Sequence, residues 1–122
     1  KLYKGVQETL KILEKKKNLM LITNKRIAPT EKMLKNAKIS ELFDNYFSVD
    51  PNDQSKKDKS TLISKTIKDY KINPKNTAYI GDTMGDFLAS KKNNIKFIFA
   101  GWGYGKYVKD ADLHLNDIRE ML

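Results

Sequence analysis

Short apolar runs place the strongest constraint on what this chain can fold into. Residues 19–22 and 78–80 are continuously apolar, and residues 95–100 form a further run that is apolar except for Lys96. Runs of this kind are typical of strands that are buried on both faces of a parallel sheet. Residues 46–49 and 112–115 are predicted as two shorter strands.

Helical patterns separate these runs. Apolar residues recur at helical spacing in residues 6–13 and again from residue 59 to residue 70. A shorter helix is expected after a loop at residues 28–30, with Thr30 as its N-cap, and a last one is expected from Asn116 onward. Because strands alternate with helices, we predict an α/β fold of parallel βαβ units with right-handed crossovers. The sequence has no internal repeat and no visible boundary, so residues 1–122 are expected to form one domain.

Composition excludes several classes of function. The net charge of +9 invites a nucleic-acid interpretation, but only Arg26 and Arg119 carry guanidinium groups, and the lysines are spread along the whole chain. Proteins that read phosphates and bases favour arginine for its bidentate fork, so we expect no nucleic-acid partner. The chain has no cysteine, which excludes disulfides and thiolate zinc sites. With no apolar run of membrane length and no leading signal peptide, we expect a cytoplasmic protein without a membrane partner.

Two carboxylates mark the most informative segment, residues 77–90, which is predicted to run from strand through tight turn to helix. Gly81 permits a sharp bend, Asp82 follows the strand, and Asp86 comes one helical turn later. Carboxylates at this spacing can converge on one point, and Mg²⁺ prefers oxygen ligands. The alternative is that Asp caps the helix and Gly-Asp simply forms the turn.

Polar side chains also follow the first apolar run. Thr23, Asn24 and Lys25 supply a hydroxyl, an amide and a cation at the carboxyl end of that strand, where open α/β sheets bind ligands. The glycines at positions 101, 103 and 105 fit neither the Walker phosphate loop nor the dinucleotide fingerprint. His114, the only histidine, is expected to be structural.

In order and spacing, these motifs resemble those of the haloacid dehalogenase superfamily. Residues 23–25 resemble the second motif of the family, and residues 81–86 resemble the fourth. A lysine at the start of a later helix resembles the third motif. Residues 3–10, 101–105 and 111–115 resemble segments of its phosphoglycolate-phosphatase-like members. The resemblance covers essentially the whole chain. It implies a Rossmann-like three-layer α/β/α core with a parallel sheet.

The resemblance also implies roles for individual residues. Thr23 and Asn24 would bind the phosphoryl group of the substrate. Asp82 and Asp86 would hold Mg²⁺, with Asp86 completing or orienting the metal shell partly through water. These roles suit phosphoryl transfer, in which positioning and charge neutralisation supply most of the catalysis.

A lysine of the third motif would neutralise charge on the phosphate. Lys59 is the preferred candidate because it lies three residues before Leu62, which matches the Lys-x-x-apolar spacing of the family. Lys57 is the second choice, since the usual Lys-Pro form of the motif is absent.

The first motif of the family, an Asp-x-Asp after the first strand, is missing. Its nearest counterpart, Asp110 to Asp112, lies in the tail with no strand before it. We therefore expect an N-terminally incomplete core that lacks the first strand and the cap. The strands ending at Thr23 and Asp82 would then either keep a gap or pair with each other directly.

The implied function is a Mg²⁺-dependent phosphatase that acts on a small phosphorylated metabolite through an aspartyl-phosphate. The nucleophilic aspartate would lie outside this chain, so the chain alone should be inactive. The alternatives are a non-catalytic relative that binds a partner and, less favoured, a haloacid dehalogenase.

Overall fold

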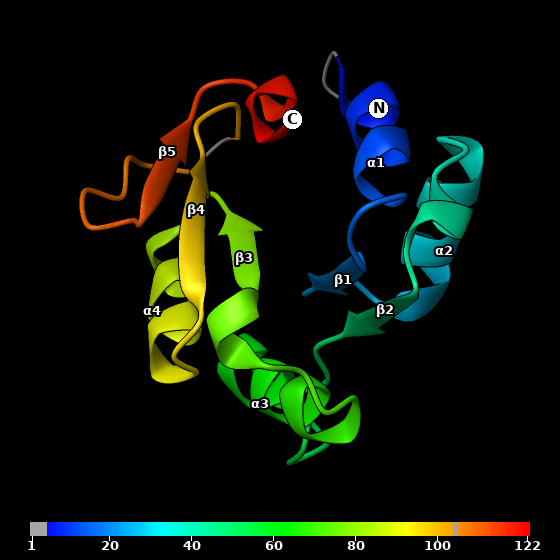
Figure 1. The fold of residues 1–122 in the computed structure, drawn as a ribbon. Helices are drawn as coiled ribbons and strands as arrows, with labels where there is room; N and C mark the ends of the chain where they lie inside the picture. Colours follow the sequence, from blue (N-terminus) through cyan, green and yellow to red (C-terminus); the bar gives the residue numbers. More distant parts are fainter. Residues whose placement is uncertain (1–4, 104) are drawn as a thin grey trace.

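Strands and helices alternate along the chain as predicted (Figure 1). The computed structural model describes residues 5–103 and 105–122, so Tyr3, Lys4 and Tyr104 of the family-like segments lie outside the described residues. The elements are α1 (Val6–Leu13), β1 (Met20–Thr23), α2 (Ile27–Asn36), η1 (Ser40–Leu42), β2 (Asn45–Ser48), α3 (Lys59–Asp69), η2 (Pro74–Asn76), β3 (Ala78–Gly81), α4 (Met84–Lys92), β4 (Lys96–Ala100), β5 (Leu113–Leu115) and η3 (Ile118–Met121).

The strands form two parallel sheets rather than one. β1 pairs with β2, and β3, β4 and β5 pair in that order. β1 and β3 belong to different sheets, so direct re-pairing of these two strands does not occur. The prediction of an α/β fold with parallel strands is confirmed, and so is the interruption between β1 and β3 that a missing strand would leave.

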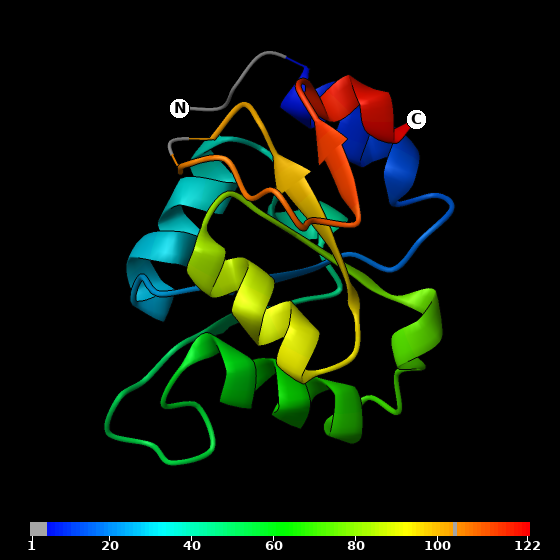
Figure 2. The ribbon, with the colours of Figure 1, turned by 90° about the vertical axis from the view of Figure 1, so that its left-hand side faces the viewer.

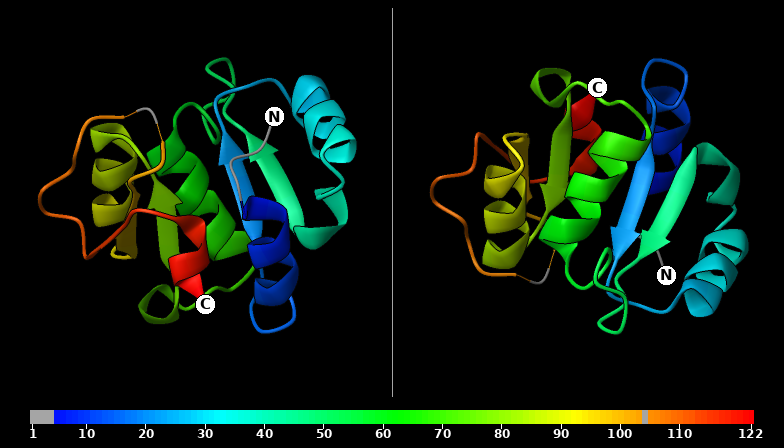
Figure 3. Two further views of the ribbon diagram at one scale, coloured as in Figure 1. Left: turned by 90° about the horizontal axis from the view of Figure 1, so that it is seen from above. Right: turned by 90° about the horizontal axis from the view of Figure 1, so that it is seen from below.

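Helices lie on both sides of the strands (Figure 3). α3 packs against β1, α4 packs against β3 and β4, and the two helices contact each other. α1 and η3 pack together on the opposite side, and Figure 2 shows α4 in front of the strands. None of the helices in the described ranges has the length and apolarity that crossing a membrane requires; α3, the longest, has 11 residues.

Two apolar clusters form the core. One contains Phe87, Phe97, Phe99 and Val108 and fixes α4 against the three-stranded sheet. The other contains Ile63, Ala89 and Ile95, and Ile22 of β1 packs against it. Because Ile22 belongs to the two-stranded sheet and Ile95 leads into β4, apolar contacts through α3 and α4 join the two sheets.

Two predicted helix starts were wrong. α2 begins at Ile27 and not after Thr30. The helix can include Pro29 because this residue lies in the first turn, where backbone N–H groups make no hydrogen bond within the helix and the missing N–H of proline costs nothing. Thr30 is buried, and its hydroxyl donates to the Arg26 carbonyl at 2.8 Å. The last helix is a short 3-10 turn capped by Asp117 in a capping box with Glu120, and not by Asn116.

Candidate functional site

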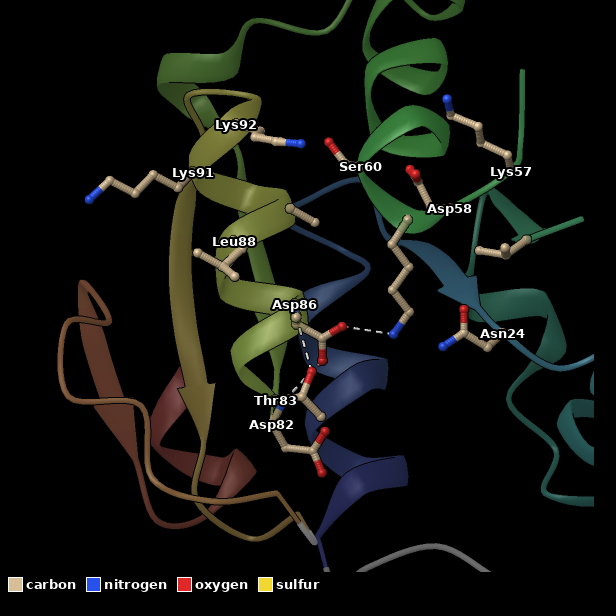
Figure 4. Close-up of a pocket in the computed structure, with 14 residues that line it drawn as sticks. Asn24, Lys57, Asp58, Ser60, Asp82, Thr83, Asp86, Leu88, Lys91 and Lys92 are labelled. Atoms are coloured by element: carbon tan, nitrogen blue, oxygen red, sulfur yellow. Dashed lines mark hydrogen bonds and ion pairs between the residues drawn. The ribbon is translucent and has the colours of Figure 1, made fainter. Parts of the chain in front are cut away.

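The ends of β1 and β3 and the start of α3 open onto one pocket of about 740 Å³ (Figure 4). Asn24 comes from the end of β1, Lys59 from the start of α3, and Asp82 and Asp86 from the turn and helix after β3. They lie near one edge because the carboxyl ends of parallel strands point the same way. The structure therefore brings together four of the five residues that the sequence singled out for the site.

Thr23 is the fifth, and it is not among the residues that line this pocket. Its hydroxyl accepts a hydrogen bond from the Lys25 N–H at 3.1 Å, and its carbonyl accepts one from the Val49 N–H at 2.9 Å. These bonds shape the turn after β1. In this structure Thr23 thus orients the turn that presents Asn24 to the pocket.

An ion pair lies at the centre of the site. The Lys59 Nζ donates to the Asp86 Oδ1 at 2.7 Å, while the Asp86 Oδ2 accepts from the Asp82 N–H at 3.3 Å. Asp86 is only 4% exposed. A carboxylate at this depth is costly without a partner, so the Lys59 ammonium offsets its desolvation.

Lys59 reaches Asp86 because of where α3 begins. Asp58 is the N-cap of α3 and accepts from the Thr61 N–H at 2.8 Å, which makes Lys59 the first residue of the helix. From there its side chain bends over the sheet edge. Lys57 is exposed and points away from Asp86 in Figure 4. The geometry favours Lys59 over Lys57 as the cation of the site.

The environment keeps Lys59 charged. Burial by itself would lower the pKa of Lys59, but the hydrogen bond to Asp86 and the negative charge of that carboxylate outweigh it and raise the pKa above its ordinary value of 10.5. Burial, followed by the Asp86 charge, raises the pKa of Tyr79, so its hydroxyl stays protonated. The site thus combines a fixed cation with a neutral phenol at neutral pH.

Gly81 allows Asp86 to approach the strand. Its φ is not in the left-handed region, so conformational freedom is not the reason for glycine here. A Cβ on Gly81 would lie 2.6 Å from the Asp86 Oδ2, well inside contact distance. The bend predicted from the sequence is therefore a close approach between backbone and carboxylate.

The donor set fits a hard cation such as Mg²⁺. Asp82 and Asp86 both line the pocket, and Mg²⁺ is commonly held by one or two carboxylates together with waters and phosphate oxygens. Within residues 5–103 and 105–122, no group of three or more histidines and acids is placed to hold a metal. Lys59 and the Asp82 N–H contact the two oxygens of Asp86, and the Gly105 N–H contacts the Asp82 Oδ2.

Sequence reasoning missed the residue that caps α4. The Thr83 hydroxyl accepts from the Asp86 N–H at 3.0 Å, so the cap is Thr83 and not the aspartate before the helix that the alternative interpretation offered. The Thr-x-x-Asp spacing was the available signal. His114 does not line the pocket: its Nε2 lies 2.7 Å from the Val108 carbonyl, and its ring stacks on Tyr107.

Comparison with known proteins gives one family. Residues 1–100 match the profile of the family described as haloacid dehalogenase-like hydrolase. The chain is 29% identical over 125 aligned residues to a probable phosphoglycolate phosphatase of Pseudomonas putida, and 30% identical over the same length to a phosphoglycolate phosphatase of Pseudomonas fluorescens. These alignments cover 98% of this chain but 49% and 46% of the relatives, so the chain spans about half their length.

Solved structures show the same fold. A haloacid dehalogenase-like family hydrolase from Streptococcus pneumoniae matches with a TM-score of 0.90 and 22% identity, over 99% of this chain and 58% of the other. A predicted phosphoglycolate phosphatase from Haemophilus somnus matches with a TM-score of 0.87 and 21% identity, over 99% and 56%. Both contain the arrangement of elements seen here as part of a longer chain.

Proposed function

Because the chain belongs to the haloacid dehalogenase-like hydrolases, we propose that it forms the phosphate- and metal-binding part of a phosphatase that hydrolyses phosphomonoesters. The observation that carries this proposal is the meeting of Asn24, Lys59, Asp82 and Asp86 at one pocket, with the Lys59–Asp86 pair at 2.7 Å. These residues come from three separate segments. A purely structural ion pair would not need the amide and the second carboxylate beside it.

Each side chain has a role in this proposal. Lys59, held cationic by Asp86, neutralises charge on the phosphate, while Asn24 binds its oxygens and Thr23 orients the turn after β1 that presents Asn24. Asp82 holds Mg²⁺ directly, and Asp86 orients the metal shell. When bound, Mg²⁺ would lower the electrostatic cost of bringing a phosphate dianion to a carboxylate-rich site.

The nucleophile would come from outside these 122 residues. β1 and β3 each have one edge without a sheet partner in the described part of the chain. Such edges expose backbone N–H and C=O groups that can form hydrogen bonds with a further strand. We infer that a strand of the whole protein lies between them and ends in the aspartate that accepts the phosphoryl group. That aspartyl-phosphate would then be hydrolysed by water.

The substrate class is a small phosphorylated metabolite. The two curated relatives are named phosphoglycolate phosphatases, which supports a small phosphate ester. The pocket of about 740 Å³ is of a size suited to a small molecule.

The test uses the protein with its native sequence upstream of residue 1 and a generic aryl phosphate. Turnover should require Mg²⁺, stop with chelator and return when Mg²⁺ is restored. D82N should lower kcat/KM by roughly 3 kcal/mol or more of transition-state stabilisation, the scale of a lost electrostatic catalytic group.

Three outcomes would contradict the proposal. Chelator-resistant turnover would remove the metal role of Asp82 and Asp86. A stable fold that binds phosphate without any turnover would favour the non-catalytic alternative, and metal-independent release of halide from a haloacid would favour the dehalogenase reaction.

A further inference from the structure

The loop between β4 and β5 lies directly on Asp82. Its glycines match no nucleotide-binding motif, yet two of them contact this carboxylate and its backbone. The Gly105 N–H donates to the Asp82 Oδ2 at 3.2 Å. The third, Gly101, lies instead against β5, where its N–H donates to the Leu115 carbonyl at 2.7 Å. The loop therefore joins Asp82 to the end of the sheet.

Space explains why these positions are glycine. A Cβ on Gly103 would overlap the Asp82 Oδ2 and lie 2.5 Å from its Cβ and 2.7 Å from its Cγ. A Cβ on Gly105 would lie 2.5 Å from the Asp82 carbonyl carbon. Gly103 does not have a left-handed φ, so the close approach is the constraint there. Any larger side chain at position 103 would have to displace the whole Asp82 side chain, including its Cβ.

Gly85, which lines the pocket beside Asp82, behaves differently. A Cβ on Gly85, in the first turn of α4, would meet only the Thr83 Oγ1 at 3.7 Å, which is ordinary van der Waals contact. Crowding by the backbone is therefore a property of the loop against Asp82 and not of every glycine near the site. Gly85 supplies a matched control for substitution by alanine.

We propose that Gly103 and Gly105 are positioning residues for Asp82. The Gly105 N–H fixes the Oδ2, and the Gly103 backbone closes the space into which the carboxylate could turn, so the direction of the Oδ1 is set before any cation binds. Groups that orient a metal ligand in this way typically change metal affinity by about 10–100-fold when mutated. The inference rests on the proposed function, in which Asp82 is a direct Mg²⁺ ligand.

The first experiment titrates Mg²⁺ alone into the full-length protein by calorimetry. G103A should raise the Kd by roughly tenfold or more, in line with lost ligand orientation. G85A should leave the Kd within about twofold of the wild type, because its added methyl group makes only an ordinary van der Waals contact with the Thr83 Oγ1 and does not touch Asp82. An unchanged Kd for G103A, with the wild type binding Mg²⁺, would overturn the inference and leave the proposed function intact.

A second measurement separates the inference from the metal role. Thermal unfolding is compared for G103A in the wild-type background and in the D82G background, which removes the side chain that the new methyl group would strike. G103A should lower Tm in the first background and have little effect in the second; an equal loss in both would overturn the inference. If the wild type binds no Mg²⁺, the metal role of Asp82 fails, and the same comparison still decides whether the loop positions Asp82.

Discussion

Replacing Lys59 by methionine tests the centre of the site. Methionine keeps the length and apolar contacts of the side chain but removes the ammonium that lies 2.7 Å from the Asp86 Oδ1. Asp86 would remain 4% exposed, and the Asp82 N–H at 3.3 Å would still donate to its carboxylate. K59M therefore leaves the buried Asp86 carboxylate without its cationic partner.

The magnitude follows from burial. Breaking a fully buried pair costs about 3–5 kcal/mol, and a hydrogen bond to a charged group contributes about 1.5–3 kcal/mol. The Lys59 side chain is 23% exposed, so water can replace part of the lost interaction. We expect K59M to lower the free energy of unfolding by about 2 kcal/mol, which lies within the range for a hydrogen bond to a charged group. K57M should cost less than about 0.5 kcal/mol, as for an ordinary surface substitution.

The assay is urea unfolding of the full-length protein, followed by far-UV circular dichroism and by the fluorescence of Trp102. Adding D86N to K59M should recover part of the loss, because the charge that was left unpaired is removed. We expect a coupling energy of about 1 kcal/mol or more between the two positions. Equal small effects of K59M and K57M, or strictly additive effects of K59M and D86N, would refute the ion pair as described.

Three further predictions follow from the same geometry. The pKa of Lys59 is raised in the folded state, so its contribution to stability is fully present below pH 10.5 and is lost only as the pH rises through the higher pKa of the folded protein. The loss of unfolding free energy caused by K59M should therefore be constant from about pH 6 to 9 and become smaller at strongly alkaline pH. G81A should destabilise by about 1–3 kcal/mol, the range for overpacking, since its Cβ would strike Asp86; a neutral effect in urea unfolding would contradict that contact. Residues 1–122 alone, with Mg²⁺ and an aryl phosphate, should show no turnover, whereas the protein extended upstream should; comparable rates would mean that the nucleophile lies within this chain.

Local pattern and family resemblance were enough to predict the fold class. The apolar runs predicted β1, β3 and β4 to within a residue or two at either end. The expected burial on both faces was wrong for β3, where Ala78 and Ile80 are exposed, because its outer edge has no sheet partner in the described part of the chain. The helical spacing at residues 59–70 likewise predicted α3. Where local chemistry was ambiguous, as at Pro29 and Asn116, the predicted boundaries were wrong, because capping and first-turn geometry depend on which neighbour supplies the hydrogen bond.

The candidate site was also predictable only in part from the sequence. The sequence alone determined which residue types stand at the ends of the strands, namely Asn24, Asp82 and Asp86, and that they should share one edge of a parallel sheet. The spacing of the family's third motif favoured Lys59 over Lys57, but only the tertiary structure decided that the Lys59 ammonium meets Asp86 and that the glycine loop closes on Asp82. These contacts join residues 27 and 23 positions apart, and such distances are fixed by how α3, α4 and the loop pack, which no local spacing can specify.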